Sequence, residues 1–371
     1  MQRKLASIQR VKRIDPIPNR DKIVLATVLG WHVIVRKDEI KEGDLVVYIE
    51  TDSILPDSET FKDIPEKKRR IRMMKMAGVY SQGICFPLSI LPEWNYEEGD
   101  DVTELLGIKK YEPDERNGKG SWYHHKNGPT MPKKWWTRFR AARWFWKKFV
   151  YKPDYVDFPK NFVPRSDETR CQLMQDILDR YKEREFTWTE KIDGSSITMW
   201  IDLKSKLHVC SRNKEILTHE DFMFQTAEAQ LGRKLERGYV YQGEILGPRI
   251  QGNKYGLKDY HIYIYNVWNI FYHRYLTPIQ MARHCAVNGI DVVPYADVPY
   301  KNAFVLGDSI DCLVEMSKGQ SILPGRTKET PREGIVIRPL EYIEEPGDDR
   351  FVGGRLSFKA INPDFMIKYK L

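Results

Sequence analysis

Short runs of hydrophobic residues alternate with polar residues over the first ninety positions of the chain. The runs are rich in β-branched and aromatic side chains, and turn segments at 16–21 and 41–44 separate them, which is typical of short β-strands. Five short strands with little helical pattern predict a small barrel or sandwich, and we expect an OB-like β-barrel. The expected strands are at residues 4–11, 22–29, 31–36, 44–50 and 83–90.

The pattern changes after Pro159 to a mixture of helical and strand periods. A period near 3.6 residues predicts helices at 171–185, 277–289 and 309–319. Runs of β-branched and aromatic residues predict strands at 186–192, 196–202, 239–246, 261–272, 333–340 and 356–361. These elements predict an α+β domain built on antiparallel sheet.

The segment between the two patterns differs in composition. Residues 116–153 contain eleven Lys or Arg and no Asp or Glu, and residues 133–149 have the period of a helix with an aromatic stripe beside a basic one. We expect the aromatic stripe to pack on the protein; stacking on nucleic-acid bases and lying on a membrane surface are the alternatives. The 371 residues fit two domains, which we place at 1–110 and 161–371 with a basic aromatic connector at 111–160.

Charge and cysteine content narrow the choice of partner and compartment. A formal charge of +8 and a pI near 9.0 favour a polyanionic partner. The basic stretch within 67–75 suits a phosphate backbone or an ordinary solvated loop equally well. The five cysteines are scattered without a C-x-x-C pair, and no run is apolar enough for a secretion signal or a membrane span. We therefore expect a soluble, cytoplasmic protein and take it to be a monomer.

A K-x-D-G sequence at residues 191–194 lies between two predicted strands. It places a lysine where a strand ends in a tight Asp-Gly turn, a rigid mount for a reactive amine. Alone this motif is weak, because chance produces it in about one chain of this length in ten. Further polar residues follow in order, each beside a predicted strand: Ser211-Arg212-Asn213, Gly243-Glu244, Glu333-Gly334 and Ser357-Phe358-Lys359.

In this order the motifs resemble those of the covalent nucleotidyltransferases, the superfamily of ATP-dependent ligases and capping enzymes. The resemblance covers about residues 160–371 and implies an antiparallel-sheet, ATP-grasp-like ligase domain. The sequence PRSDETR at 164–170 looks like the segment before the first motif of RNA ligases, in which the arginine matching Arg170 contacts the nucleotide phosphates. The barrel-like domain ahead of it, with GWHVIVRKDEIKEGDLVVYIE at 30–50, is similar to that of the Deinococcus- and Naegleria-type RNA ligases.

The resemblance implies an ATP-dependent RNA ligase that joins 3′-OH and 5′-phosphate ends, in RNA or nick repair. Lys191 would carry AMP, which then passes to the 5′ end of RNA or of a nicked RNA/DNA duplex. ATP and Mg²⁺ or Mn²⁺ are the implied cofactors. The implied catalytic residues are Lys191, Asp193, Glu244, Glu333 and Lys359, and the three acids among them would hold the metal. The implied nucleotide-binding residues are Glu190, Arg170, Arg212, Gly194, Tyr263 and Tyr265.

The charge state of Lys191 is central to this hypothesis. A lysine amine is a poor nucleophile at its ordinary pKa of about 10.4, because it is protonated at neutral pH. Burial, Arg212 and a metal on the α-phosphate would lower the pKa of Lys191, whereas neighbouring carboxylates would stabilise its ammonium.

Other interpretations stay open. Taken singly, Glu244 and Glu333 are ordinary strand-edge acids, and alternating tyrosines are more often packing residues. An mRNA guanylyltransferase or a DNA-nick ligase would use the same chemistry on another substrate. A catalytically inactive nucleic-acid-binding relative would keep the fold. One departure leaves this alternative open: where many relatives have K-x-K, this chain has Ser357-Phe358-Lys359.

Overall fold

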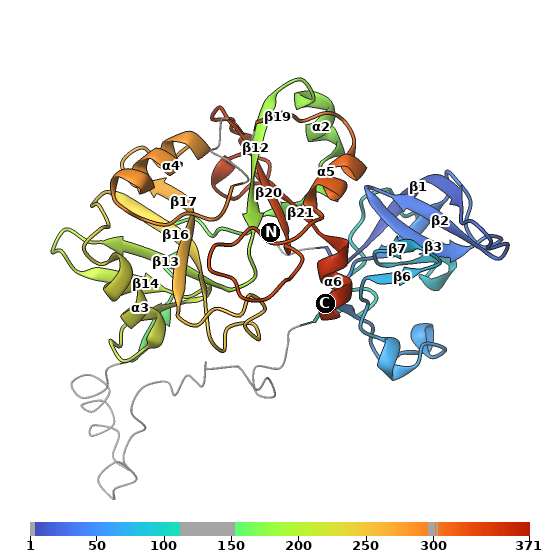
Figure 1. Ribbon diagram of the computed structural model, residues 1–371. Helices are drawn as coiled ribbons and strands as arrows, with labels where there is room; N and C mark the ends of the chain where they lie inside the picture. Colours follow the sequence, from blue (N-terminus) through green and yellow to red (C-terminus); the bar gives the residue numbers. More distant parts are fainter. Residues whose placement is uncertain (1–3, 112–152, 296–300, 302) are drawn as a thin grey trace, which may run out of the picture.

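The computed structural model describes residues 4–111, 153–295, 301 and 303–371 (Figure 1). The predicted helix at 133–149 and most of the predicted connector lie outside the described residues. The described chain forms a small β domain near the N-terminus and a larger α+β domain (Figure 1).

The N-terminal domain is a curved antiparallel sheet with the strand order β3-β2-β1-β4-β8. Its strands are β1 (Ala6–Pro16), β2 (Ile23–Val28), β3 (Trp31–Arg36), β4 (Leu45–Ile49) and β8 (Ile84–Pro87). They fall on the five predicted segments, so the prediction for this domain is confirmed. The long β1 pairs with β4 through its first half and with β2 through its second, and a bulge between Val11 and Arg13 separates the two halves. This change of partner curls the sheet into an OB-fold half-barrel.

Short elements complete the N-terminal domain. β5 (Ser53–Ile54) pairs with β9 (Lys109–Lys110), and β6 (Met74–Met76) forms a hairpin with β7 (Val79–Ser81). Three 3-10 turns lie between the strands, at Glu59–Phe61, Glu66–Lys68 and Leu88–Ile90.

The α+β domain contains two sheets. The larger has seven strands in the order β10-β15-β14-β13-β16-β17-β18, and all of its neighbours are antiparallel. Its strands are β10 (Tyr155–Asp157), β13 (Ser195–Ile201), β14 (Leu207–Cys210), β15 (Lys214–Ile216), β16 (Tyr239–Leu246), β17 (His261–Asn269) and β18 (Arg274–Tyr275).

The smaller sheet has the order β11-β21-β20-β12-β19. Its strands are β11 (Thr169–Arg170), β12 (Glu185–Lys191), β19 (Phe304–Val305), β20 (Gly334–Pro339) and β21 (Phe358–Ile361). Only β11 and β21 pair in parallel among the described strands of this sheet. Since β12 runs in this sheet and β13 in the larger one, the turn between them joins the two.

Helices cover the outer faces of both sheets (Figure 1). They are α2 (Gln175–Tyr181), α3 (Phe222–Leu231), α4 (Pro278–Val287) and α5 (Ile310–Ser317). The last helix, α6 (Pro363–Tyr369), lies beside the N-terminal domain (Figure 1). The predictions for α4 and α5 are confirmed, and Thr277 begins α4 with a capping box. The helix predicted at 171–185 is shorter than expected: a 3-10 turn at Cys171–Leu173 precedes α2, and β12 already begins at Glu185.

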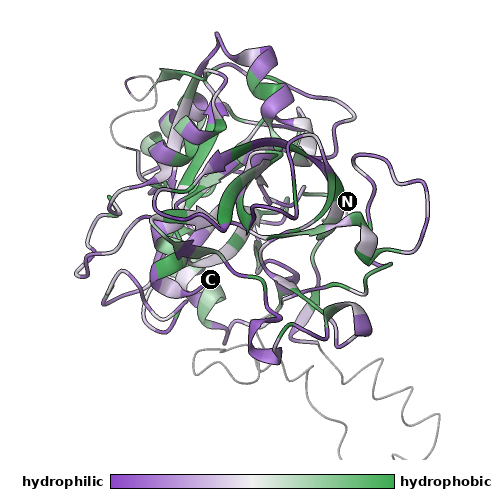
Figure 2. Cartoon of the chain, turned by 90° about the vertical axis from the view of Figure 1, so that its right-hand side faces the viewer, coloured by the Kyte–Doolittle hydropathy of each residue, from purple (hydrophilic) through white to green (hydrophobic). Residues whose placement is uncertain are grey.

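Each sheet packs against its helices through a separate hydrophobic core. Met223 and Phe224 of α3 and Met281 of α4 pack beneath the larger sheet. Ile177 of α2 and Leu313 of α5 pack beneath the smaller one. Figure 2 shows hydrophobic residues gathered along the strands, with hydrophilic residues on the outer loops. Because each sheet buries its outer face under helices, the two inner faces are left to line a shared polar cavity.

The two domains touch at several points beside α5 and α6 (Figure 1). The backbone N–H of Gly30 donates to the carbonyl of Gln172 at 3.0 Å. His32 lies 2.8 Å from Asp311 of α5, and the hydroxyl of Tyr80 donates to Asp364 of α6. None of the helices in the described part of the chain is both long and apolar enough to cross a membrane.

Candidate active site

Lys191 is the last residue of β12, and a turn through Asp193 and Gly194 leads directly into β13. The backbone N–H of Asp193 donates to the hydroxyl of Tyr255 at 2.8 Å, which fixes the turn. Glycine is required at 194 because a Cβ there would lie 2.5 Å from the carbonyl oxygen of Ile245. The lysine therefore stands on a rigid strand end, close to the edge of the larger sheet.

Two glutamates from different sheets face Lys191. Strand pairing sets Lys191 opposite Gly334, so the preceding Glu333 lies beside the lysine, and Nζ donates to Oε2 of Glu333 at 2.6 Å. Glu244 comes from β16, where it lies opposite Ser196. Residues more than fifty positions apart in sequence are thus brought together by sheet pairing alone.

Opposing effects set the pKa of Lys191. Burial by itself lowers the pKa, but Glu333, Glu244 and Asp193 raise it more, so the net pKa lies above the ordinary value. The charged ammonium is therefore the resting form, as expected from the neighbouring carboxylates. Chemistry at this amine requires that the negative charge around it be neutralised first.

The glutamates respond to the same environment. Burial raises the pKa of Glu244 to about 8, with Lys191 opposing the shift and Glu333 and Asp193 adding to it. Burial also raises the pKa of Glu333, against the effect of Lys191. Crowded carboxylates that resist ionisation are poised to accept a second cation.

Lys254, which was not among the predicted site residues, pairs with the carboxylate of Asp193. Both side chains are largely buried, with exposed fractions of 12% and 17%. The Lys254 ammonium also lies 5.4 Å from the ring of Phe365 and 5.0 Å from the ring of Tyr369, both in α6. Its loop carries no motif, so only the fold reveals this contact.

The predicted metal role of the three acids rests on the chemistry of their donors. Carboxylate oxygens suit Mg²⁺ and Mn²⁺. Within the described residues, however, three acidic, histidine or cysteine side chains do not converge into a group that could hold a metal by itself. Asp193 and Glu333 are each paired with a lysine. The residues therefore fit an ion that takes its remaining ligands from water or phosphate, and the metal role stays a prediction.

Three predicted cations also line the cavity. Arg170 of β11 lies opposite Lys359 of β21, because these two strands pair in parallel. Burial, together with the charges of Lys191 and Arg170, lowers the pKa of Lys359 to about 7. Arg212 lies at the rim, where it donates to Asp167 at 2.7 Å and remains 60% exposed. The structure thus sets Arg170 and Lys359 deep in the cavity and Arg212 at its mouth.

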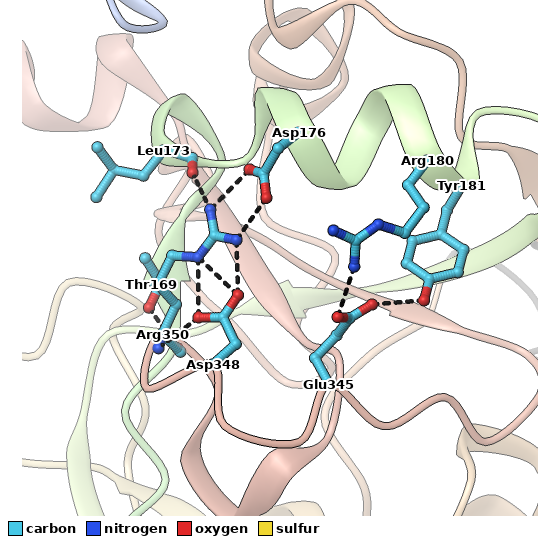
Figure 3. A network of polar contacts seen from close by, with 8 residues as sticks. All are labelled: Thr169, Leu173, Asp176, Arg180, Tyr181, Glu345, Asp348 and Arg350. Carbon is cyan, nitrogen blue, oxygen red and sulfur yellow. Dashed lines mark hydrogen bonds and ion pairs between the residues drawn. The ribbon is translucent and has the colours of Figure 1, made fainter.

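Hydrogen bonds of Arg350 hold the segment that carries Arg170 (Figure 3). The guanidinium of Arg350 donates to both oxygens of Asp176, at 2.7 and 2.6 Å, and to the carbonyl of Leu173 at 2.8 Å. The carbonyl of Arg350 accepts from the hydroxyl of Thr169 at 2.7 Å. These contacts fix both ends of the short segment around β11, and sequence reasoning missed them.

The two candidate tyrosines have different surroundings. Tyr265 lines the cavity, and its hydroxyl lies 2.7 Å from that of Ser166 and 3.3 Å from that of Ser196. Tyr263 is buried in a hydrophobic cluster with Ile192 and does not line the described cavity. The carboxylate of Glu190 accepts from the backbone N–H of Ile322 at 2.7 Å, so it is held in a structural bond.

Ser357 stands where many relatives have the first lysine of the K-x-K motif. Ser357 is 3% exposed, and its hydroxyl has no hydrogen-bond partner among the described residues. Arg338 and Arg355, also buried, both lie near Glu168, with N–O distances of 3.4 and 3.5 Å. Of these three residues, Arg338 and Glu168 line the cavity.

One cavity of about 730 Å³ collects nearly all the predicted residues. Tyr263 is the exception. The predicted residues that line it are Lys191, Asp193, Glu244, Glu333, Lys359, Glu190, Arg170, Arg212, Gly194 and Tyr265. Asp52, Arg70 and Tyr111 of the N-terminal domain also line it, and the sequence did not predict that contribution.

An OB-fold domain followed by a two-sheet domain whose inner faces share a lysine-containing cavity is the organisation of a polynucleotide ligase of the nucleotidyltransferase class. Residues 184–361 match the family model of RNA ligase, and residues 5–88 match that of an OB-fold domain. The C-terminal domain thus matches the RNA ligase family, and a domain that matches an OB-fold model precedes it.

Solved structures of the Naegleria gruberi RNA ligase share this organisation over the full length. A mutant with ATP and manganese is 27% identical, with a TM-score of 0.77 and 100% of each chain covered. A mutant with AMP and manganese is 27% identical, with a TM-score of 0.77 and 99% of each chain covered. The ligase with pyrophosphate is 28% identical, with a TM-score of 0.76 and 99% of each chain covered. No curated protein matches the sequence.

Proposed function

We propose that this RNA ligase uses ATP to seal RNA ends through AMP carried on Lys191. The observation that carries the proposal is the position of Lys191, in one cavity with Glu333 at 2.6 Å and with Glu244, Arg170 and Lys359 around it. The similarity to a ligase solved with ATP, AMP and manganese supports ATP and a divalent metal as its cofactors.

In the first step, Nζ of Lys191 loses its proton and attacks the α-phosphorus of ATP. A P–N bond forms, and the P–O bond to pyrophosphate breaks. Arg170 and Lys359 are placed to neutralise charge on the phosphates. Asp193, Glu244 and Glu333 would hold a divalent ion, which supplies positive charge that offsets their own and favours the neutral amine.

Two further transfers complete the reaction. An oxygen of the RNA 5′-phosphate attacks the phosphorus of lysyl-AMP, so the P–N bond breaks and the AMP passes to the RNA end. The 3′-hydroxyl then attacks the 5′-phosphate, the new phosphodiester forms, and AMP leaves. All three steps develop negative charge at one place, which a single fixed set of cations can serve.

Tyr265 is the tyrosine that the cavity favours for stacking on adenine, because it lines the cavity and Tyr263 does not. We also propose that the ligase domain begins before Tyr155 and not at residue 161, because β10 pairs with β15 of the larger sheet. The OB-fold domain supports RNA, or a nicked RNA/DNA duplex, as the partner. A monomeric state and a cytoplasmic location remain predictions from the sequence.

Labelling with α-labelled ATP tests the proposal. The full chain with Mg²⁺ or Mn²⁺ is expected to acquire label on Lys191, and Lys191→Met is expected to lose both labelling and RNA joining. Lys204→Met, which changes an exposed lysine in the turn after β13, is the matched control and is expected to label normally. Labelling of the Lys191→Met variant would remove the mechanism.

The rival functions give different results in the same assay. A guanylyltransferase would be labelled by GTP and not by ATP. A DNA-nick ligase would seal all-DNA nicks as well as those ending in ribose, whereas we expect a requirement for ribose at the 3′-OH side. A catalytically inactive relative, which the buried Ser357 keeps open, would give no label with either nucleotide.

A further inference from the structure

Three turns meet at the end of the seven-stranded sheet that is remote from Lys191. β13 starts beside this lysine and spans seven residues, so at about 3.3 Å per residue its far end lies about 20 Å away. The turns are those at residues 202–206, 236–238 and 270–273. The guanidinium of Arg237 donates to the hydroxyl of Ser205, and the N–H of Ile270 donates to the carbonyl of Gly238 at 2.9 Å. The turns therefore form one surface, which we call the turn surface.

The third turn holds two neighbouring aromatic side chains toward solvent. Phe271 is 76% exposed and Tyr272 is 72% exposed. Phe271 packs one edge against Gly238, where a Cβ would lie 2.4 Å from the ring. Leu203, in the first turn, is also exposed. Flat apolar rings of this kind are suited to stacking on unpaired bases.

The backbone of the third turn is fixed before any ligand arrives. The side-chain oxygen of Asn269 accepts from the N–H groups of Phe271 and Tyr272, both at 3.0 Å. His273 adopts the left-handed conformation with φ 47°, which is uncommon for a residue other than glycine. Little backbone ordering is therefore needed when these rings bind a partner.

Exposed arginines accompany the aromatic rings. The guanidinium carbon of Arg274 lies 5.6 Å from the centre of the Tyr272 ring and 5.5 Å from that of Tyr342. Arg237 is also exposed. Among the described residues, neither arginine forms an ion pair with a carboxylate. Both are therefore available to an anion from outside the protein.

The acids of the turn surface are occupied by local hydrogen bonds. Asp202 accepts from the backbone N–H groups of Lys204 and Lys206, at 2.9 and 2.8 Å, and the side chains of both lysines are exposed. Glu236 accepts from the side-chain amide of Asn288 at 2.6 Å. The cations of the surface therefore outnumber its acids, which favours a polyanion as the partner.

The inner face of β13 connects this surface with the cavity. Ser196 and Thr198 line the cavity, and Trp200 follows them on the same face of the strand. Phe162, whose ring centre lies 5.5 Å from that of Trp200, is exposed. Aromatic surface therefore continues from the cavity along the strand.

We propose that the turn surface binds an unpaired stretch of the RNA strand whose end is joined in the cavity. Phe271 and Tyr272 stack on its bases, and Arg237 and Arg274 contact its phosphates. About six stacked nucleotides, at about 3.4 Å each, span the distance from the cavity to this surface. The inference rests on the proposed function, which makes RNA the substrate.

Binding of single-stranded RNA by variants of the full chain tests the surface. The probe is a fluorescent RNA of about twelve nucleotides with a 5′-hydroxyl, and the measurement is fluorescence anisotropy. Combining Phe271→Ala with Tyr272→Ala weakens binding at least about tenfold, because two stacking rings are lost. Arg274→Gln lowers the slope of log affinity against log salt by about 0.7, as expected for one phosphate contact fewer. Trp94→Ala, at an 80% exposed position of the N-terminal domain, is the matched control and stays within about twofold.

The length and pairing of the RNA give two sharper comparisons. An RNA of about four nucleotides reaches the cavity but not the turn surface, so wild type and the double variant join it equally, whereas joining of the longer RNA slows in the variant. A blunt RNA duplex loses less affinity than the single strand, because its bases are already stacked in pairs. Equal losses for duplex and single strand, or for short and long RNA, overturn the proposal.

Further outcomes separate this role from others. RNA affinity that is unchanged in the double variant overturns the proposal and leaves the surface to another partner, such as a protein. A purely structural role predicts a lower melting temperature and slower labelling of Lys191 without RNA, and that result also overturns it, since we expect both to match wild type. If wild-type protein acquires no label from ATP, the proposed function fails, while the anisotropy measurement still decides the turn surface.

Discussion

Lys254 illustrates how a single side chain controls the charge of the site. Its ammonium is paired with Asp193 and rests against two aromatic rings of α6, so it holds the place that a metal ion would take at this carboxylate. Two cations compete for one acid there. A metal bound at Asp193 would have to displace Lys254 or share the carboxylate with it.

Replacing Lys254 by methionine is expected to tighten the binding of Mn²⁺ by the nucleotide-free protein, about tenfold, because the competing charge is lost while the aliphatic contact with Phe365 and Tyr369 remains. Electron paramagnetic resonance of free Mn²⁺ measures this directly. The exposed pair Lys62–Glu59 offers a control, since Lys62→Met leaves the site untouched. Weaker Mn²⁺ binding in Lys254→Met would show that the lysine supports the metal site and does not compete for it.

Lys359 gives the site a pH dependence near neutrality. Its pKa is lowered to about 7, first by burial and then by Lys191 and Arg170, so its amine is charged below pH 7 and neutral above it. The charged form binds phosphate better. The affinity for a nonhydrolysable ATP analogue is therefore expected to fall as pH rises through about 7, and titrations at pH 6 and pH 8 measure the difference.

Arginine keeps its charge over this whole range, so the loss of affinity between pH 6 and pH 8 is expected to be smaller in Lys359→Arg than in wild type. The remaining loss comes from Glu244, which lines the same cavity and has a pKa of about 8. Lys368→Arg is the matched control, because Lys368 is an exposed lysine of α6. A pH dependence that persists unchanged in Lys359→Arg would assign the effect to another group.

At the level of elements, the strands were the easiest to predict. The alternation of buried and exposed positions in β2 and β3 follows the pleat, and the sequence displays it directly. α3 and α6 were missed although their signals are present: Asp221 caps α3, and Asn362 followed by Pro363 begins α6. α2 was predicted too long, because pairing with β20 draws the chain into β12 at Glu185.

The order of the motifs led to the right residues for the cavity, because each lies at a strand that the two sheets bring together. Contacts between loops could not be foreseen in the same way. Lys254 and Arg350 lie in loops without periodicity, and their partners are fixed only by tertiary packing. Tyr263 and Tyr265 occupy the same face of β17, so the sequence could not tell which one reaches the cavity.

Arg350, in the loop before β21, stabilises the segment that carries Arg170, and Arg350→Met tests this role. The hydrogen bonds of Arg350 with Asp176 and Asp348 raise the pKa of Arg350 and hold the pKa of both acids below the ordinary range. Because these groups are partly exposed, we expect a loss of about 1–3 kcal/mol at pH 7, measured by urea unfolding, with slower labelling of Lys191.

The pH dependence of this loss has a definite sign. Both acids have lowered pKa values, so their contribution is present above the ordinary aspartate pKa of about 3.9 and is lost as pH falls through their folded values. The difference between wild type and Arg350→Met is thus expected to shrink in acid. Arg180→Met, which removes the half-exposed Arg180 and leaves the largely buried Glu345 bonded to Tyr181, is the matched control and costs under about 1 kcal/mol (Figure 3).

At the scale of the whole molecule, the OB-fold domain forms part of the cavity wall. Gly30 lies against Gln172, His32 against Asp311 and Tyr80 against Asp364, so the domain is docked beside β11 and α6. This docking brings Asp52 to Arg170. Sequence could indicate that two domains exist, but their relative placement depends on matching surfaces that are not neighbours in the chain.

Gly30 provides a way to loosen the docking without changing the ligase-domain residues around Lys191. A Cβ at this position would lie 2.9 Å from Cα of Gln172 and 2.5 Å from Cδ1 of Ile310, so Gly30→Val forces the domains apart. Since Lys191, Glu244 and Glu333 all belong to the ligase domain, their mutual contacts survive the change. We expect joining of nicked RNA to fall at least tenfold while labelling of Lys191 at saturating ATP falls far less. Lys37→Val, at an exposed position of the same domain, keeps both activities, and an equal loss of both in Gly30→Val would mean that the OB-fold domain is needed for the lysine chemistry itself.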